Sequence, residues 1–177
     1  MNGEMTLVFD LETNGLLNDL TRIHCIAIYD SETKEIETFN DEKNNKYSIT
    51  EGLSKLQVAD TLVGHNIIGF DIPAISKLYN FFSTSARIVD TLLLSRLFHP
   101  NIYDIDCRHK WKYMPLQLRG RHSLESYGYR LGEYKGEFGK TSDWAEWSQE
   151  MEDYCVQDVE VTKKLCNHFH RYLIGSN

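Results

Sequence analysis

The sequence predicts an α/β protein in which a mixed five-stranded sheet is flanked by helices. Short apolar runs crowd the first 40 residues, and later apolar runs alternate with stretches that carry apolar residues at helical spacing. Runs of this length between turn residues are typical of strands, whereas spacings of three and four are typical of amphipathic helices. Consecutive early strands followed by alternating strands and helices favour a mixed sheet that is covered by helices.

The expected elements follow one another closely along the chain. Strands are expected at residues 5–12, 22–29, 35–39, 61–65 and 87–89. Helices are expected near residues 50–56, 73–79, 90–98, 122–130 and 151–173. Pro73 suits a helix start, because it lacks an N–H that would be unpaired there. We expect residues 100–121 to form one long irregular segment, and such segments are often functional.

Length and composition restrict the class of protein. The chain has 177 residues, of which 41% are hydrophobic and 25% charged, as in ordinary globular proteins. We expect a single domain over residues 1–177. The sequence contains neither a signal peptide nor an apolar run of membrane-spanning length, so we expect a cytoplasmic protein without a membrane partner. The four cysteines lack zinc-site spacing, which indicates reduced thiols.

Asp10 and Glu12 stand at the end of the first expected strand. Side chains alternate along a strand, so both carboxylates point to the same face and repel each other. A divalent cation would explain the pair, because hard cations bind carboxylate oxygens. A solvated turn that begins after Phe9 would also explain it, and this stretch alone does not decide between the two.

A polar loop, Gly64-His65-Asn66-Ile67-Ile68-Gly69-Phe70-Asp71, follows the fourth expected strand. Asp71 stands at a helix start, where its carboxylate would cap free backbone N–H groups. Asn66 fits a turn. Both residues have this ordinary interpretation unless other parts of the chain bring further acids beside them.

Asp158 lies within an otherwise inward-facing stripe of the last expected helix. Tyr154, Asp158, Val161 and Leu165 follow the spacing of one helix face. No basic residue stands three or four positions from Asp158. A buried carboxylate without a partner is costly or has a raised pKa. A bound cation would supply the partner, as would an arginine from elsewhere in the chain.

Together these positions supply four acids: Asp10, Glu12, Asp71 and Asp158. Two divalent cations, Mg²⁺ or Mn²⁺, would neutralise them, and a pair of such ions forms a clamp for in-line phosphoryl displacement. Tyr154, one turn before Asp158, is placed to orient the attacking water. The net charge of −7 would ordinarily argue against a polyanionic partner, but four of the negative charges would be metal ligands.

The order of these motifs resembles a known family. D-x-E at 10–12, N-x3-F-D at 66–71 and Y-x3-D at 154–158 are similar to the Tyr-bearing subclass of the DEDD exonuclease superfamily, whose fold is ribonuclease H-like. Longer strings at residues 90–97, 126–133 and 154–159 resemble the proofreading domain of T-seven-like phage DNA polymerases. The resemblance covers nearly all of residues 5–173.

The resemblance implies a role for each matched residue. Asp10, Glu12 and Asp158 would hold one metal ion. Asp10 would bridge to a second ion, which Asp71 would support through water. Tyr154 would position the attacking water.

The resemblance also implies contacts with the substrate. The Thr13 backbone would lie near the 3′-OH, and Leu16 would act as a wedge between the end bases, with core packing as the alternative for Leu16. Asn66 and Phe70 would line the strand path.

Residues 108–121 contain five Lys or Arg residues and no acid, with Trp111 and Tyr113 between them. Such a composition suits single-stranded nucleic acid, because cations follow phosphates and rings stack on bases. We therefore expect Lys110, Lys112 and Arg119 to bind substrate, with a solvated loop as the alternative. Two further expectations are structural: Asp90 caps the helix that follows it, and Trp144 and Trp147 pack in the core or against another domain.

These observations predict a metal-dependent 3′→5′ exonuclease that hydrolyses the 3′-terminal phosphodiester of single-stranded DNA and releases nucleoside 5′-monophosphates. Its context would be proofreading or DNA processing in phage DNA replication, in the host-cell cytoplasm. The motifs do not separate DNA from RNA, so an exoribonuclease of the same superfamily stays open, as does a non-catalytic nucleic-acid-binding module. A polymerase module or subunit is an expected partner, whether the chain is an excised domain or free-standing.

Overall fold

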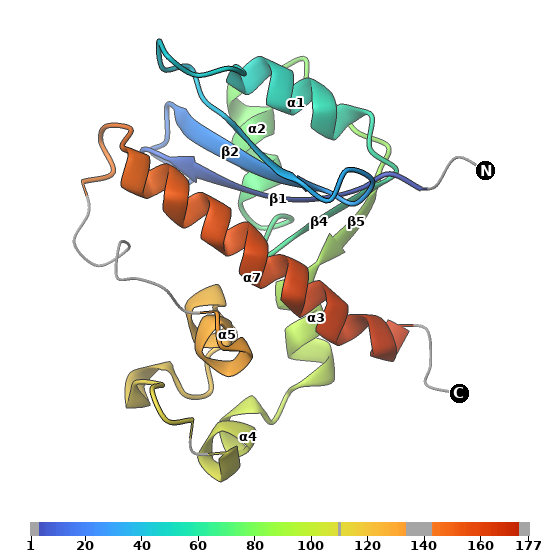
Figure 1. Ribbon diagram of the computed structural model, residues 1–177, viewed down its shortest axis with the longest axis vertical. Coiled ribbons are helices and arrows are strands. Elements are labelled where there is room, and N and C mark those ends of the chain that lie inside the picture. The colour runs from blue at the N-terminus through green and yellow to red at the C-terminus, as the bar shows by residue number, and fades with distance from the viewer. Residues whose placement is uncertain (1–3, 110, 134–142, 174–177) are drawn as a thin grey trace.

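Figure 1 shows the computed structural model, which describes residues 4–109, 111–133 and 143–173. Five strands form one sheet in the order β3-β2-β1-β4-β5. The strands are β1 (Thr6–Thr13), β2 (Ile23–Asp30), β3 (Ile36–Phe39), β4 (Thr61–Gly64) and β5 (Arg87–Asp90). β2 is antiparallel to β1 and β3, whereas β4 is parallel to β1 and β5. The predicted mixed sheet is confirmed.

The described helices are α1 (Ile49–Gln57), α2 (Asp71–Leu78), α3 (Thr91–Phe98), α4 (Ile102–His109), α5 (Leu124–Leu131) and α7 (Gln149–Leu173), with a 3-10 turn η1 (Leu116–Leu118). Within the described part of the chain, no helix is long and apolar enough to cross a membrane. The prediction of one irregular segment over residues 100–121 is wrong, because α4 and η1 form inside it. Its helical pattern is obscured because α4 buries an acid, Asp106, beside Ile102.

Helices cover both faces of the sheet (Figure 1). Leu7, Phe9 and Leu11 of β1 belong to the apolar cluster that includes α1. Val8 belongs to a second cluster that includes Cys155 of α7. Alternation along β1 therefore sends its even-numbered side chains toward α7, and this direction decides where the acids of β1 lie.

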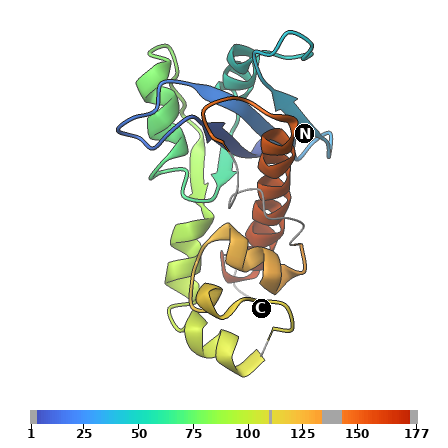
Figure 2. The ribbon, with the colours of Figure 1, turned by 90° about the vertical axis from the view of Figure 1, so that its left-hand side faces the viewer.

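A group of helices lies beyond the end of the sheet, as Figures 1 and 2 show; we call residues 91–131, which include α3, α4, η1 and α5, the helical lobe. The lobe packs on the C-terminal half of α7. A third buried cluster joins them through Ile102 and Tyr127 of the lobe and Val161, Leu165 and Phe169 of α7. α7 thus connects the sheet to the lobe.

Asp90 links the lobe to the loop after β4. Its carboxylate accepts a hydrogen bond from Leu92 N at 2.9 Å, so the predicted cap of α3 is confirmed. It also accepts hydrogen bonds from Asn66 N at 2.9 Å and Ile68 N at 3.1 Å. These bonds hold Asn66 in a left-handed conformation, with φ 67°, at the edge where the parallel strands β1 and β4 end.

Candidate active site

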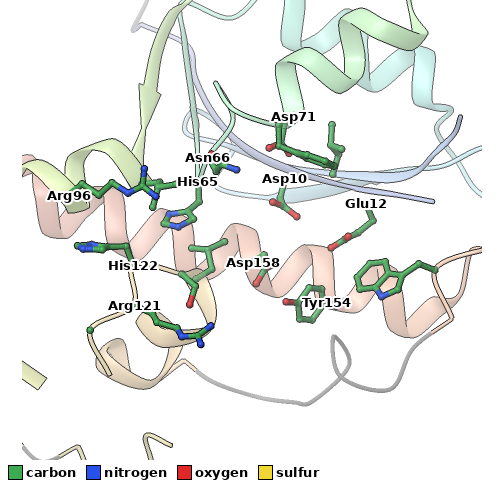
Figure 3. A pocket seen from close by; sticks show the side chains of 17 residues that line it. Asp10, Glu12, His65, Asn66, Asp71, Arg96, Arg121, His122, Tyr154 and Asp158 are labelled. Carbon is green, nitrogen blue, oxygen red and sulfur yellow. The ribbon is translucent and has the colours of Figure 1, made fainter. Parts of the chain in front are cut away.

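A cavity of about 770 Å³ opens between the end of β1, the loop after β4, the helical lobe and α7 (Figure 3). The structure brings together at this cavity all four acids that the sequence suggested, and with them the predicted tyrosine: Asp10, Glu12, Asp71, Asp158 and Tyr154. They come from a strand, a helix start and a helix face. The cavity therefore exists because β1, α2 and α7 converge at one end of the sheet.

β1 supplies two of these acids. It runs through Thr13, and Asp10 and Glu12 pair with Ala27 and Cys25 of β2, so the alternative of a solvated turn after Phe9 is wrong. Both carboxylates lie on the face that α7 covers. The thiol of Cys155 lies 3.4 Å from the Asp10 carbonyl oxygen and 3.6 Å from its carboxylate, which ties α7 to β1 at this point.

Asp71 is the first residue of α2. Phe70 is the N-cap, so Asp71 stands one position inside the helix and not at the cap position. Its carboxylate accepts hydrogen bonds from its own backbone N–H and from that of Leu11 on β1. This contact turns the buried Asp71 toward the end of β1, as Figure 3 shows.

Tyr154 and Asp158 lie one turn apart on α7. Figure 3 shows both side chains directed toward Asp10 and Glu12 across the cavity. The ring of Trp144 meets the ring of Tyr154 edge-on, with centroids 6.5 Å apart and planes at 80°. The helical stripe inferred from the sequence therefore divides, because Val161 and Leu165 enter the apolar cluster while Asp158 enters the cavity.

Without a bound cation, the ionised state of the four acids is unfavourable. Burial, followed by repulsion from Asp71, Asp158 and Glu12, raises the pKa of Asp10 well above its usual range. Burial also raises the pKa of Glu12, and it raises the pKa values of Asp71 and Asp158 to about 7. Among the described residues, no Lys, Arg or His forms an ion pair with any of the four. The donor atoms are hard oxygens, and this set fits hard divalent cations.

The surroundings of Tyr154 keep its phenol protonated. Burial, together with the charges of Asp158, Glu12 and Asp10, raises the pKa of its phenol above the usual value. Tyr154 therefore keeps its proton at neutral pH. It can donate a hydrogen bond to an anionic or water oxygen, but it cannot serve as a base.

A second, smaller cavity of about 340 Å³ lies beside the acids. Thr13, Leu16, Phe70 and Trp144 are among its lining residues. Leu16 is 74% exposed, so the alternative of core packing for this residue is wrong. Asn66 and Phe70 also line the main cavity. The residues that the resemblance assigned to the substrate thus lie around two adjoining hollows.

Of the basic segment at residues 108–121, Arg121 lines the main cavity. Lys110 lies outside the described residues, and Lys112 packs on the ring of Tyr113, with its ammonium nitrogen 4.8 Å from the ring centroid. Neither Lys112 nor Arg119 lines the main cavity. Their role in substrate binding remains a prediction.

Other residues at the cavity were not anticipated. Arg96, Arg121, His65 and His122 line it, and so does Trp144. Trp144 also packs against the apolar cluster under α7, so the expectation of core packing describes only part of its surroundings. The one sequence signal for Arg96 is its spacing of four from Leu92, which places both on one face of α3.

Comparison with known protein families matches residues 7–170 to the RNase_H superfamily. The chain belongs to the ribonuclease H superfamily. Within it, the D-x-E, N-x3-F-D and Y-x3-D motifs mark a DEDD-type exonuclease domain, and the resemblance inferred from the sequence is confirmed.

Relatives of this ribonuclease H-like domain include two phage enzymes. The DNA-directed DNA polymerases of Escherichia phage T7 and Enterobacteria phage T3 are each 34% identical to the chain, in an alignment 181 residues long that covers 90% of this chain. The match covers 26% of each polymerase, so the chain spans about a quarter of their length.

Solved structures share the fold. Brucella melitensis NrnC aligns with a TM-score of 0.64 and 21% identity over 96% of this chain and 74% of its own. NrnC with bound Mg²⁺ aligns with a TM-score of 0.63, 21% identity and coverage of 96% and 73%. The zinc-bound E. coli ExoI–ssDNA complex aligns with a TM-score of 0.55 and 15% identity, over 98% of this chain and 42% of its own.

Proposed function

We propose that this domain is a divalent-cation-dependent 3′→5′ exonuclease that removes nucleoside 5′-monophosphates from the 3′ end of single-stranded DNA. One observation carries the proposal: four carboxylates converge on one cavity, and no basic side chain of the described residues pairs with them. A phosphodiester is itself an anion, so bound cations would be needed before it could approach this site.

The four acids have distinct places in the proposal. Asp10, Glu12 and Asp158 would hold one Mg²⁺ or Mn²⁺ ion, and Asp10 with Asp71 would hold a second. Two such ions, when bound, lower the pKa of water and stabilise charge on the attacking and leaving oxygens. Their charge would also restore the ionised state of the acids, since opposite charge lowers the pKa of a carboxyl.

Tyr154 would orient the attacking water. Its protonated phenol would donate a hydrogen bond to the oxygen of that water and so fix the direction from which the oxygen meets phosphorus. The edge-on contact with Trp144 restricts the ring of Tyr154. A group that fixes direction in this way increases turnover without taking up the proton.

The smaller cavity supports action at an end rather than within a strand. Leu16, Phe70 and Trp144 give it an apolar lining, which suits the face of a base, and Thr13 lies beside Glu12 at its border. The terminal nucleoside would occupy this cavity while its phosphate lies at the carboxylates.

DNA is proposed as the substrate because the relatives at 34% identity are DNA-directed DNA polymerases. We propose that a polymerase module or subunit delivers the 3′ end, since the corresponding region of those relatives is part of a much longer chain. ExoI, which shares the fold, is described in complex with ssDNA, and NrnC is described bound to pGG. RNA is the alternative to be measured, because the motifs of the sequence do not separate DNA from RNA.

The test is digestion of 5′-labelled single-stranded DNA and RNA of one sequence, with Mg²⁺, with Mn²⁺ and with chelator. We expect a ladder that shortens from the 3′ end on DNA, the release of 5′-monophosphates, and no reaction with chelator. A 3′-phosphorylated strand serves as the control for end recognition. Internal cleavage, or no cleavage with either cation, would contradict the proposal, and faster digestion of RNA would reassign the substrate.

A further inference from the structure

The main cavity has two chemically opposite ends (Figure 3). The carboxylates gather at one end, and Arg96, Arg121, His65 and His122 lie at the other, which we call the basic end. Among the described residues, no carboxylate forms an ion pair with Arg96 or Arg121. We propose that the basic end is a phosphate subsite, which binds a phosphodiester on the 5′ side of the bond that is cut. This inference rests on the proposed function.

The positive charge of the basic end comes from the two arginines. Burial lowers the pKa of His65 to about 4, and burial followed by nearby arginines lowers the pKa of His122. Both imidazoles are therefore neutral at neutral pH, whereas the guanidinium groups of Arg96 and Arg121 stay charged. A guanidinium group offers a planar set of donors that matches the oxygens of a phosphate.

A hydrogen-bond network holds the two arginines at the same end. Ser95, the neighbour of Arg96 on α3, has its hydroxyl 2.6 Å from Nδ1 of His122, the neighbour of Arg121. The same hydroxyl lies 2.5 Å from the hydroxyl of Tyr127 on α5. These contacts fix α3 against the segment before α5. Both arginines therefore line the same end of the cavity although they lie far apart in the sequence.

The main chain at Arg121 is held in place as well. Its carbonyl oxygen accepts a hydrogen bond from Arg130 at 2.8 Å, and Gly120 N donates to Asp106 at 2.8 Å. Gly120 has a φ of 75°, and a Cβ built there would lie 2.9 Å from the ring of Tyr103, so only glycine fits without displacement. Residues 120–121 thus present the arginine from a fixed backbone.

The order of the two cavities gives the strand a direction. The smaller cavity shares Glu12, Phe70 and Trp144 with the main one, but it does not include Arg96 or Arg121. The two hollows therefore meet on the carboxylate side. In the proposed complex, the last nucleoside of the strand lies in the smaller cavity and the phosphodiester to be cut lies at the carboxylates. The strand then continues toward the basic end, so the phosphate bound there lies on the 5′ side of the cut bond.

The experiment pairs protein variants with neutralised substrates. Arg96→Gln and Arg121→Gln are compared with Arg87→Gln, an exposed arginine at the start of β5 that does not line the cavity. Each protein is given natural single-stranded DNA and strands in which one linkage, scanned from the 3′ end, is an uncharged methylphosphonate. We expect kcat/KM on natural DNA to fall about tenfold for each cavity arginine, since a charged hydrogen bond contributes roughly this much, and to stay unchanged for Arg87→Gln.

The scan identifies the linkage that is bound. At one linkage on the 5′ side of the cut bond, the methylphosphonate should slow the wild-type enzyme as much as the substitutions do, and it should slow Arg96→Gln and Arg121→Gln little further. Two results would overturn the subsite. In the first, the decrease in kcat/KM from an arginine substitution and the decrease from a methylphosphonate multiply at every linkage. In the second, the arginine variants digest natural DNA at the wild-type rate. If wild-type protein fails to digest natural DNA, the proposed function itself fails. Failure of the proposed function is therefore distinguished from failure of the phosphate subsite.

A binding measurement gives a readout that does not depend on catalysis. In an Asp10→Asn background, fluorescence anisotropy of labelled DNA in Mg²⁺ reports affinity against salt concentration. Loss of one phosphate contact should reduce the slope of log affinity against log salt by about 0.7 for a single strand. An unchanged slope for both arginine variants would also overturn the subsite.

Discussion

Two regions of the molecule bury carboxylates and treat them in opposite ways. In the helical lobe, the side chain of Asp106 is 0% exposed, and its two carboxylate oxygens accept hydrogen bonds from Nε and Nη2 of Arg130 at 2.8 and 2.7 Å. Gly120 N and the indole of Trp111 donate to it as well, at 2.8 and 2.9 Å. Burial alone would raise the pKa of Asp106, but these donors outweigh burial and lower it.

At the cavity, no Lys, Arg or His of the described residues forms an ion pair with the acids, and backbone N–H donors to Asp71 do not outweigh its burial. The pKa values of Asp71 and Asp158 rise to about 7, and that of Asp10 rises well above its usual range. The difference teaches how to separate structural from functional acids. A buried carboxylate that the chain neutralises stabilises the fold, whereas a group of buried carboxylates that the chain leaves without a basic partner is a candidate ligand set.

The largest expected effect concerns activity. Asp10→Asn and Asp158→Asn should each lower kcat on single-stranded DNA by about a thousandfold or more, because each removes a cation ligand worth several kcal/mol in the transition state. The free energy of unfolding in chelator should not fall, since each change removes one repelling charge. Asp153→Asn, an exposed acid of α7, is the control. Wild-type turnover in either cavity variant would remove its carboxylate from the site.

The matching substitution in the lobe should show the reverse pattern. Asp106→Asn leaves Arg130 buried without its counter-charge and should lower the free energy of unfolding by about 3–5 kcal/mol. Urea denaturation followed by circular dichroism measures this change. A second change, Arg130→Met, should recover part of the loss. If Asp106→Asn had the same free energy of unfolding as wild type, Asp106 would not be a stabilising acid, and the comparison between the two regions would fail.

Tyr154→Phe should have a smaller effect than removal of an acid. Loss of one hydrogen bond to a charged or reacting group corresponds to about a tenfold to hundredfold lower kcat. The Mn²⁺ concentration for half-maximal activity should stay the same, because the phenol is not placed as a ligand. Steady-state kinetics over a Mn²⁺ series separates the two quantities, and an unchanged kcat would argue against an orienting role.

A further expected effect is the pH dependence of stability without cations. The folded pKa values of Asp71 and Asp158, about 7, lie above the unfolded value of about 4. Their contribution is therefore fully present below about pH 4 and is lost as pH rises through about 7. Asp106 has the opposite sign, since its lowered pKa makes its contribution fall as the solution becomes acidic.

Thermal unfolding in chelator should thus show Tm falling by about 10 °C or more between pH 5 and pH 8, and Mg²⁺ should reverse this fall at pH 8. In Asp71→Asn the fall should be smaller than in wild type. A Tm that rises steadily over this range in chelator would contradict the raised pKa values.

Local patterns in the sequence indicated the direction of three of the acids, and the order of the motifs suggested that all four belong to one site. Alternation along β1 sends Asp10 and Glu12 to one face, and the helical spacing of Tyr154 and Asp158 sends both inward. The basic end could not be found in this way. Arg96 and Arg121 converge through the hydrogen bond between Ser95 and His122, which joins two segments with no repeating pattern between them.

The helical lobe was misjudged for a related reason. The segment that contains α4 was expected to be irregular because its charges interrupt any apolar stripe. The charge that interrupts it, Asp106, is buried only because Arg130 of α5 neutralises it. A tertiary ion pair of this kind leaves no trace in local hydrophobic periodicity, so the sequence showed the basic composition of the segment but not its helix.

The most direct test of the four-acid site is Mn²⁺ binding to the folded protein at pH 7.5, followed by electron paramagnetic resonance. The account predicts two bound Mn²⁺ ions per chain in wild type and in Asp153→Asn, fewer in Asp71→Asn, and strongly weakened binding in Asp10→Asn. Mn²⁺ binding that is absent in wild type, or equal in Asp10→Asn and Asp153→Asn, would contradict the claim that these buried carboxylates form a cation site.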